Sequence, residues 1–119
     1  MIIKFKPGKN DNAKIPGVVQ EELIQHIEAF NKKHLSKGLC KYVPKIQEKY
    51  LYLTRTIGNG SVEQICRLRY TDDINNMDFA IYKYSTEKYS SSECNFDGYK
   101  LVDGTVEGAM KAGLKAYPI

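Results

Sequence analysis

Hydrophobic and polar residues alternate in three runs of the chain, at residues 50–57, 62–69 and 77–84. This period of two is typical of β-strands that have one buried face. Asn59-Gly60 separates the first two runs, and this dipeptide favours a type I′ hairpin because both residues tolerate positive φ. The pattern therefore predicts an antiparallel meander over about residues 49–84.

A two-residue hairpin at Asn59-Gly60 also predicts which residues of the first two strands face each other. It places aliphatic side chains opposite one another on one face and tyrosines opposite arginines on the other. A slip of one residue would set Leu51 against Arg67 and mix the two faces. The predicted pairs are Leu51–Leu68, Leu53–Cys66, Ile57–Val62, Tyr50–Arg69 and Tyr52–Arg67.

The second face of this sheet is rich in tyrosine and arginine. On the third strand the same alternation places Asp78 beside Arg69, where an exposed ion pair contributes at most about 1 kcal/mol. Thr54, Ile65 and Glu63 are expected on this face as well. We define the Tyr/Arg face as the sheet face that carries Tyr50, Tyr52, Arg67, Arg69, Tyr82 and Tyr84.

Apolar residues at helical spacing predict one helix before the meander and one after it. The first spans about residues 17–36 and the second about residues 106–117, with Thr105 as N-cap. We expect Gly38 to cap the C-terminus of the first helix. Small residues on the second helix indicate close approach to the sheet. The apolar positions are Val19, Leu23, Ile27 and Phe30, then Val106, Met110, Leu114 and Tyr117.

The connecting segments are less regular. Pro44 indicates an edge strand in residues 39–49, where Lys41, Lys45 and Lys49 either protect the edge or bind phosphate. Residues 85–104 form either a mobile lid or a packed connection. Two short strands, Ile2–Phe5 and Tyr99–Val102, would extend the sheet.

Length and composition indicate one α+β domain over residues 1–119, with a sheet of three to five strands and two helices. The hydrophobic share of 42% is ordinary for a globular protein. No apolar run approaches the roughly 20 residues of a membrane-spanning helix, and the charged N-terminus does not resemble a signal peptide. We therefore expect a cytoplasmic protein. The net charge of +4 permits a nucleic-acid partner without implying one.

We expect no metal, no cofactor and no catalytic residue. Cys40, Cys66 and Cys94 are odd in number and widely spaced, which favours free thiols. Together with His34 they lack the paired spacing of zinc ligands. His26 lies eight residues before His34, about 12 Å along a helix, so the two are too far apart to share a metal ion.

The C-terminal half contains a set of aromatic and glycine-rich segments: Phe79–Ser85, Tyr89, Gly98, Asp103–Ala109 and Ala116–Pro118. This set resembles small uncharacterised bacterial proteins that are grouped as a domain of unknown function. The resemblance implies a bacterial protein without an assigned activity, and it transfers no site residues.

Three functions fit these features. The first is a non-enzymatic binding module that uses the Tyr/Arg face for a protein partner or a homodimer. The second is single-stranded nucleic-acid binding on the same face, against which Asp78 and Glu63 count. The third is an enzyme with the 85–104 loop over a sheet pocket. Alternatively, a helix or the long loop simply covers the Tyr/Arg face.

Overall fold

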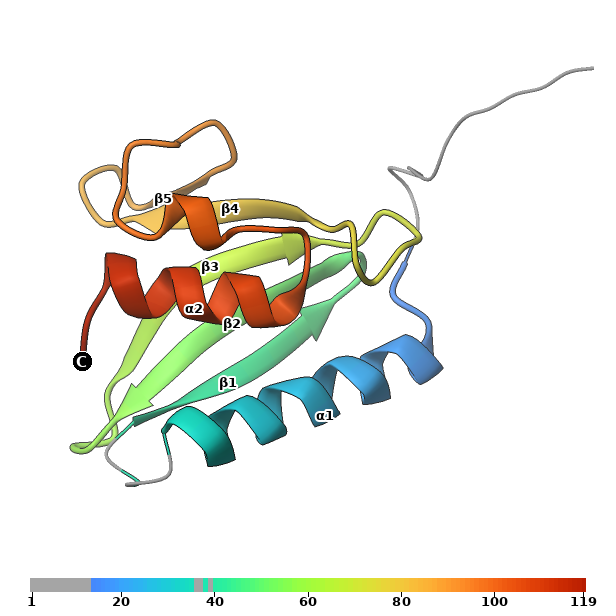
Figure 1. Ribbon diagram of the computed structural model, residues 1–119, viewed down its shortest axis with the longest axis horizontal. Helices are drawn as coiled ribbons and strands as arrows, with labels where there is room; N and C mark the ends of the chain where they lie inside the picture. Colours follow the sequence, from blue (N-terminus) through green and yellow to red (C-terminus); the bar gives the residue numbers. More distant parts are fainter. Residues whose placement is uncertain (1–13, 36–37, 39) are drawn as a thin grey trace, which may run out of the picture.

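The computed structural model describes residues 14–35, 38 and 40–119, and it has the predicted α+β architecture (Figure 1). Five antiparallel strands form one sheet in the order β1-β2-β3-β4-β5, so each strand lies beside its neighbours in the chain. The elements are α1 (Gly17–His34), β1 (Cys40–Gln47), β2 (Tyr50–Ile57), β3 (Val62–Arg69), β4 (Asp78–Lys83), β5 (Lys88–Ser90), the 3₁₀ turn η1 (Tyr99–Leu101) and α2 (Val106–Ala116).

Both helices pack on the same, aliphatic face of the sheet (Figure 1). The Tyr42 side chain of β1 is buried there, and its hydroxyl donates a hydrogen bond to the Met110 carbonyl of α2 at 2.7 Å. Asn31 of α1 bonds both backbone groups of Tyr42 at 2.9 Å. The core between these layers contains Leu23, Ile27, Phe30, Leu51, Leu53, Leu68, Ile81, Val106 and Met110.

A glycine allows the close approach of α2 to the sheet, as the small residues of this helix predicted. A Cβ atom at Gly113 would lie 2.5 Å from Cγ2 of Ile65 and closer still to the Tyr42 hydroxyl. Thr105 is the N-cap of α2, also as predicted, since its Oγ1 accepts a hydrogen bond from the Gly108 N–H at 3.0 Å.

The loop between β2 and β3 differs from the prediction by one residue. The Ile57 N–H donates to the Ser61 carbonyl at 3.0 Å, so three residues rather than two form the loop. Val62 consequently faces Thr56, and the predicted pair with Ile57 is wrong. A β-bulge at Ile65 then absorbs one residue, after which the other four predicted pairs are confirmed.

The bulge corrects the predicted positions of two side chains. Ile65 was expected on the Tyr/Arg face, but it is fully buried under α2. Glu63 was expected there too, but it faces Arg55, whose side chain is buried on the helix side of the sheet. The three-residue loop reverses the side of every β3 residue between the turn and the bulge, which explains both errors.

The strand pairing also places the edge strand β1 and the long connection over residues 85–104. β1 is an edge strand containing Pro44, as predicted. Residues 85–104 contain β5 and η1, and the strand expected at Tyr99–Val102 is instead the 3₁₀ turn η1. Phe96 stacks on Phe79 at a centroid distance of 6.0 Å, which packs this connection against β4. The strand predicted at Ile2–Phe5 lies outside the described residues.

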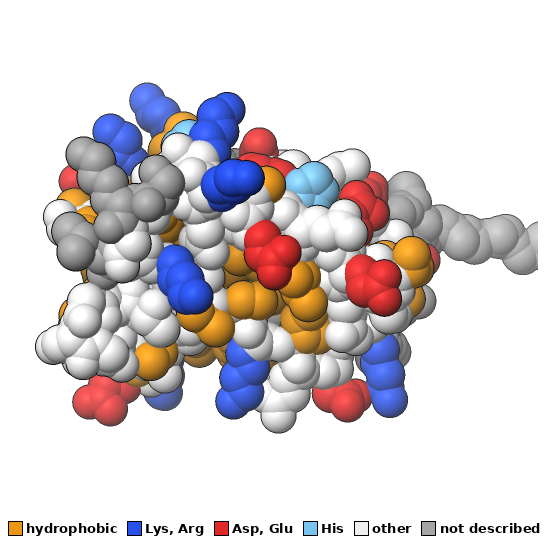
Figure 2. Space-filling model, turned by 90° about the horizontal axis from the view of Figure 1, so that it is seen from below, with side chains coloured by type: hydrophobic (Ala, Val, Ile, Leu, Met, Phe, Trp, Pro, Cys, Tyr) orange, Lys and Arg blue, Asp and Glu red, His pale blue; other side chains and the backbone are white. Residues whose placement is uncertain are grey.

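The outer surface of α1 separates its charges along the helix axis. Its last turn carries Lys32, Lys33 and His34 after a first half that contains Glu21 and Glu22. Figure 2, the view from below, shows basic side chains gathered toward the left and acidic ones toward the right of the upper surface. This order suits the helix dipole.

Within the described residues, neither helix combines the length and apolar character needed to cross a membrane.

Candidate binding face of the sheet

The Tyr/Arg face lies on the side of the sheet opposite both helices. Because both helices pack on the aliphatic face, neither of them covers it in the described structure (Figure 1). Its residues on β2, β3 and β4 are half-buried by one another, and Tyr84, just beyond β4, is 48% exposed. Of the alternatives that the sequence left open, coverage of this face by a helix is therefore excluded.

Tyrosine rings form a continuous row across the Tyr/Arg face. Tyr52 contacts Tyr50 at 5.9 Å and Tyr89 at 5.5 Å between ring centroids. Tyr82 contacts Tyr89 at 5.0 Å and Tyr84 at 4.8 Å. The row thus brings residues of β2, β4 and β5 together. Such inclined ring pairs each contribute about 0.5–1.5 kcal/mol beyond their buried area.

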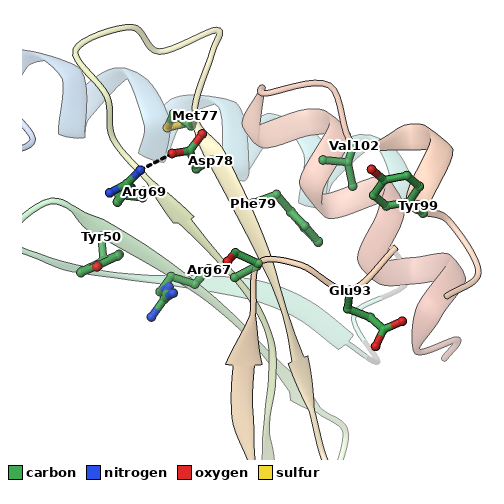
Figure 3. A pocket seen from close by; sticks show the side chains of 11 residues that line it. Tyr50, Arg67, Arg69, Met77, Asp78, Phe79, Glu93, Tyr99 and Val102 are labelled. Atoms are coloured by element: carbon green, nitrogen blue, oxygen red, sulfur yellow. Dashed lines mark hydrogen bonds and ion pairs between the residues drawn. The ribbon is translucent and has the colours of Figure 1, made fainter. Parts of the chain in front are cut away.

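Two arginines of β3 occupy different environments on this face. Arg67 lies between two rings, with Cζ 4.6 Å from the Tyr50 centroid and 5.2 Å from the Tyr89 centroid. Arg69 forms the predicted ion pair with Asp78 at 2.5 Å, which is confirmed (Figure 3). The Arg67 guanidinium contacts no carboxylate of the described chain, so cation–π attraction is its main restraint.

Tyr89 belongs to this face, although the sequence did not identify it. It faces Tyr82 in the β4–β5 ladder. Burial is the main reason why the pKa of Tyr89 rises from 10.0 to about 12. A signal was present, since Lys88-Tyr89-Ser90 follows the β4 strand after four turn residues. Three residues are too short a run for periodicity to identify a strand.

Two tyrosine hydroxyls hold the structure together where the β3–β4 ladder ends, beyond the Cys66–Ile81 pair. Tyr84 donates to the Gln64 carbonyl at 2.8 Å, and Tyr117 of the α2 end donates to the Tyr82 carbonyl. Tyr84 is therefore partly structural, in addition to its ring contact with Tyr82 on the face.

A groove of about 540 Å³ opens at one end of the Tyr/Arg face. Figure 3 shows Tyr50 and Arg67 on one side of β4, with Phe79 and Tyr99 on the other. The groove exists because β5 pairs only with residues 81–83 of β4. The start of β4 therefore has β3 on one side and no β5 residue paired with it on the other. Its carboxylates are already bound to cations, Asp78 to Arg69 and Glu93 to Lys83 at 2.7 Å.

Positive charge dominates the Tyr/Arg face. Lys41 and Lys45 of β1 lie on this side because they pair with Thr56 and Tyr52 of β2. They add to Arg67 and Arg69. Asp78 is the single carboxylate on this face among the described strands, because Glu63 lies on the other side. Of the two carboxylates that counted against a nucleic-acid partner, Glu63 therefore no longer does so.

The histidines and thiols lie elsewhere. His26 joins the two helices, with Nδ1 2.5 Å from a Glu107 carboxylate oxygen. His34 packs on the Phe30 ring at 4.4 Å. Burial raises the pKa of the Cys66 thiol on the aliphatic face, which makes it a poor nucleophile. In the described part of the chain, no three metal-ligating side chains cluster.

We found no family model, no curated protein and no solved structure that matches this chain. The resemblance of its C-terminal half to small bacterial proteins therefore stays a prediction. Functional inference rests on the geometry and charge of the Tyr/Arg face.

Proposed function

We propose that this protein is a non-enzymatic binding module whose Tyr/Arg face contacts a macromolecular partner. One observation carries the proposal: both helices leave this face open, while Arg67 is held between the rings of Tyr50 and Tyr89. Tyrosine and arginine are enriched among the residues that contribute most to binding at interfaces, because each offers a large contact area with a polar end.

The order of this face before binding supports the proposal. Ring contacts from Tyr50 to Tyr84 restrict side chains that would otherwise lose rotational freedom when a partner binds. Immobilising a free side chain costs roughly 0.5–1.5 kcal/mol, and restraint in advance reduces that cost. A row of mutually packed aromatic rings is therefore suited to binding.

The ionic state of the groove favours binding over catalysis. A general base works best when its pKa lies near the working pH. Instead, the hydrogen bond from Lys83 lowers the pKa of Glu93, with a smaller contribution from the Asn95 N–H. Asp78 is likewise engaged by Arg69. The lowered pKa makes Glu93 a weak base, and both carboxylates are engaged by neighbouring cations.

We also propose that the protein is located in the cytoplasm. Its support is the odd number and wide spacing of Cys40, Cys66 and Cys94, all of which are free thiols in the structure. Free thiols are usual in a reducing compartment. A protein partner, including a second copy of this chain, and a nucleic acid are the classes of macromolecule that the face accommodates.

Photo-cross-linking tests the proposal without assuming the partner's class. The photoreactive residue p-benzoylphenylalanine would replace Tyr52 on the face or, as a matched control, the exposed Gln25 on α1. In cells that naturally contain the protein, we expect a discrete adduct from position 52 and none from position 25. No adduct at 52 from folded protein, or equal adducts from both positions, would contradict a binding role for this face.

A further inference from the structure

We infer that the partner of the Tyr/Arg face is a single-stranded nucleic acid, an inference that rests on the proposed function of that face. The first argument is charge. Lys41, Lys45 and Arg67 lie on the face, and its only carboxylate among the described strands, Asp78, is paired with Arg69. A protein partner would need a matching acidic surface, whereas every nucleotide of a nucleic acid carries a negative phosphate.

The second argument is the placement of cations beside rings. Lys45 of β1 lies directly opposite Tyr52 of β2, and Arg67 of β3 lies opposite Tyr52 on the other side. The tyrosine row is therefore flanked by positive charge on both neighbouring strands. Proteins that bind single strands without sequence preference combine these two features, since phosphates meet the cations while bases stack on rings.

The third argument concerns the rings themselves. Tyr52 and Tyr82 are inclined to Tyr89 by 62° and 69°, so none of the three is stacked parallel on its neighbour. The rings of Tyr52 and Tyr89 meet edge to face, with their centroids 5.5 Å apart. Ring faces that are not covered by a parallel ring can accept a base.

The fourth argument distinguishes a single strand from a duplex. The face belongs to a sheet, and both helices lie behind it, so neither helix can enter a major groove from this side (Figure 1). Duplex bases are stacked on one another and present only their edges to a protein. Bases of a single strand can leave their stack and lie on aromatic side chains.

Fluorescence anisotropy with a labelled oligothymidylate of about 12 nucleotides tests this inference, in a salt series. We expect binding that weakens with salt at a log–log slope of about −2 to −3, since roughly 0.7 counterion is released per phosphate contact. Tyr52→Ala should weaken binding about tenfold, consistent with the loss of one stacked base. Arg67→Ala should weaken it by a similar factor and make the salt slope shallower by about 0.7, consistent with the loss of one phosphate contact.

Control variants keep the test decisive. Lys111→Ala removes an exposed cation from α2, behind the sheet, and should leave affinity unchanged. Lys45→Ala changes an exposed residue of the face itself, so its loss of affinity, about threefold or more, does not depend on the stability of the core. A duplex of the same length should compete poorly.

Absence of salt-dependent binding, equal losses in Lys111→Ala and Lys45→Ala, or equal competition by the duplex would each overturn the inference. Those results would not by themselves remove the proposed function. An adduct from position 52 that is destroyed by protease and resists nuclease would identify a protein partner, or a second copy if its mass is twice that of the chain. If position 52 gives no adduct, both the inference and the proposed function fail.

Discussion

At the scale of single residues, Arg55 is a charged side chain whose burial costs stability. Its side chain is 1% exposed, and it forms an ion pair with the Glu63 carboxylate, 3.3 Å from Nη2. Nε and Nη1 have no hydrogen-bond acceptor in the described structure, although the Tyr42 ring lies 5.8 Å from Cζ. Desolvating a guanidinium costs several kcal/mol, which one ion pair and one ring do not fully offset.

This imbalance predicts opposite effects for two substitutions. Arg55→Met replaces the cation by an apolar side chain of similar length, and we expect the free energy of unfolding to stay equal or rise by about 1–4 kcal/mol. Glu63→Gln leaves the buried cation without its carboxylate, and we expect a loss of about 2 kcal/mol, reduced from the fully buried case because Glu63 is 40% exposed.

Urea denaturation of the two variants measures both effects, with the exposed Glu87→Gln as a control expected to stay within about 0.5 kcal/mol of the parent. A larger loss in Arg55→Met than in Glu63→Gln would show that the guanidinium stabilises the fold by itself.

Tyr89 predicts how stability responds to alkaline pH. Its pKa is about 12 in the folded protein and 10.0 for the free side chain, because burial disfavours the phenolate. The folded state therefore holds this proton more tightly than the unfolded state. The stabilisation is complete below pH 10 and is lost as pH rises from 10 toward 12. Burial also raises the pKa of Tyr42 above 10.0, so this phenol adds to the loss of stability as the pH rises above 10.

Tyr89→Phe removes the Tyr89 contribution while keeping the ring. We expect the variant to lose less stability than the parent between pH 9 and about 11.5, as measured by urea denaturation at a series of pH values. Tyr99→Phe, at an exposed ring outside the row, is the matched control and should follow the parent. Identical curves for Tyr89→Phe and the parent would contradict the burial of this phenol.

At the scale of elements, periodicity was sufficient to predict the meander and both helices. It also predicted strand pairs such as Leu51–Leu68 and Tyr52–Arg67. These depend on a long run in which one register alone keeps the faces separate. The loop between β2 and β3 was not predictable, because an Asn-Gly dipeptide fits both a two-residue and a three-residue hairpin. The bulge at Ile65 leaves only a weak trace in the pattern, because the adjacent apolar pair Ile65-Cys66 that interrupts the alternation can also occur in a regular strand.

The same reasoning explains which residues of the candidate site could be predicted from the sequence. Six residues of the Tyr/Arg face follow from strand alternation alone. Tyr89 depends on a three-residue strand, and the side of Glu63 depends on the bulge. Which face the helices would cover was also open, because both arrangements bury apolar stripes. Contacts such as Tyr42 to Met110 decide it, and they join residues far apart in the chain.

The packing of α2 predicts opposite outcomes at two glycines. Gly113→Ala would force a methyl group against Ile65 and the Tyr42 hydroxyl, so we expect a loss of about 1–3 kcal/mol from overpacking. Gly17→Ala, at the start of α1, has no atom within 4 Å of the new Cβ and should be neutral or stabilise by up to about 1 kcal/mol.

Thermal unfolding of these two variants by circular dichroism provides the measurement. A Gly113→Ala protein as stable as the parent would mean that α2 does not approach the sheet as closely as the structure shows. A marked loss in Gly17→Ala would contradict the open surroundings of the first helical residue.

At the scale of the whole molecule, an uncovered sheet face is not unusual. Antiparallel sheets commonly pack one face on helices and present the other to water. The outer face of such sheets is typically polar, whereas this one carries a row of tyrosines with Arg67 held among them. The composition and charge of the face, rather than its openness, are what call for a functional explanation.

Nuclear magnetic resonance titration tests that explanation most directly. Isotope-labelled protein would be titrated with the oligothymidylate while backbone amide and Arg side-chain signals are followed. We predict that shifts concentrate at Tyr50, Tyr52, Arg67, Tyr82 and Tyr89, with α1 and α2 unchanged. Shifts confined to the helices, or no shifts at an oligonucleotide concentration well above that of the protein, would contradict the assignment of the Tyr/Arg face as a nucleic-acid-binding surface.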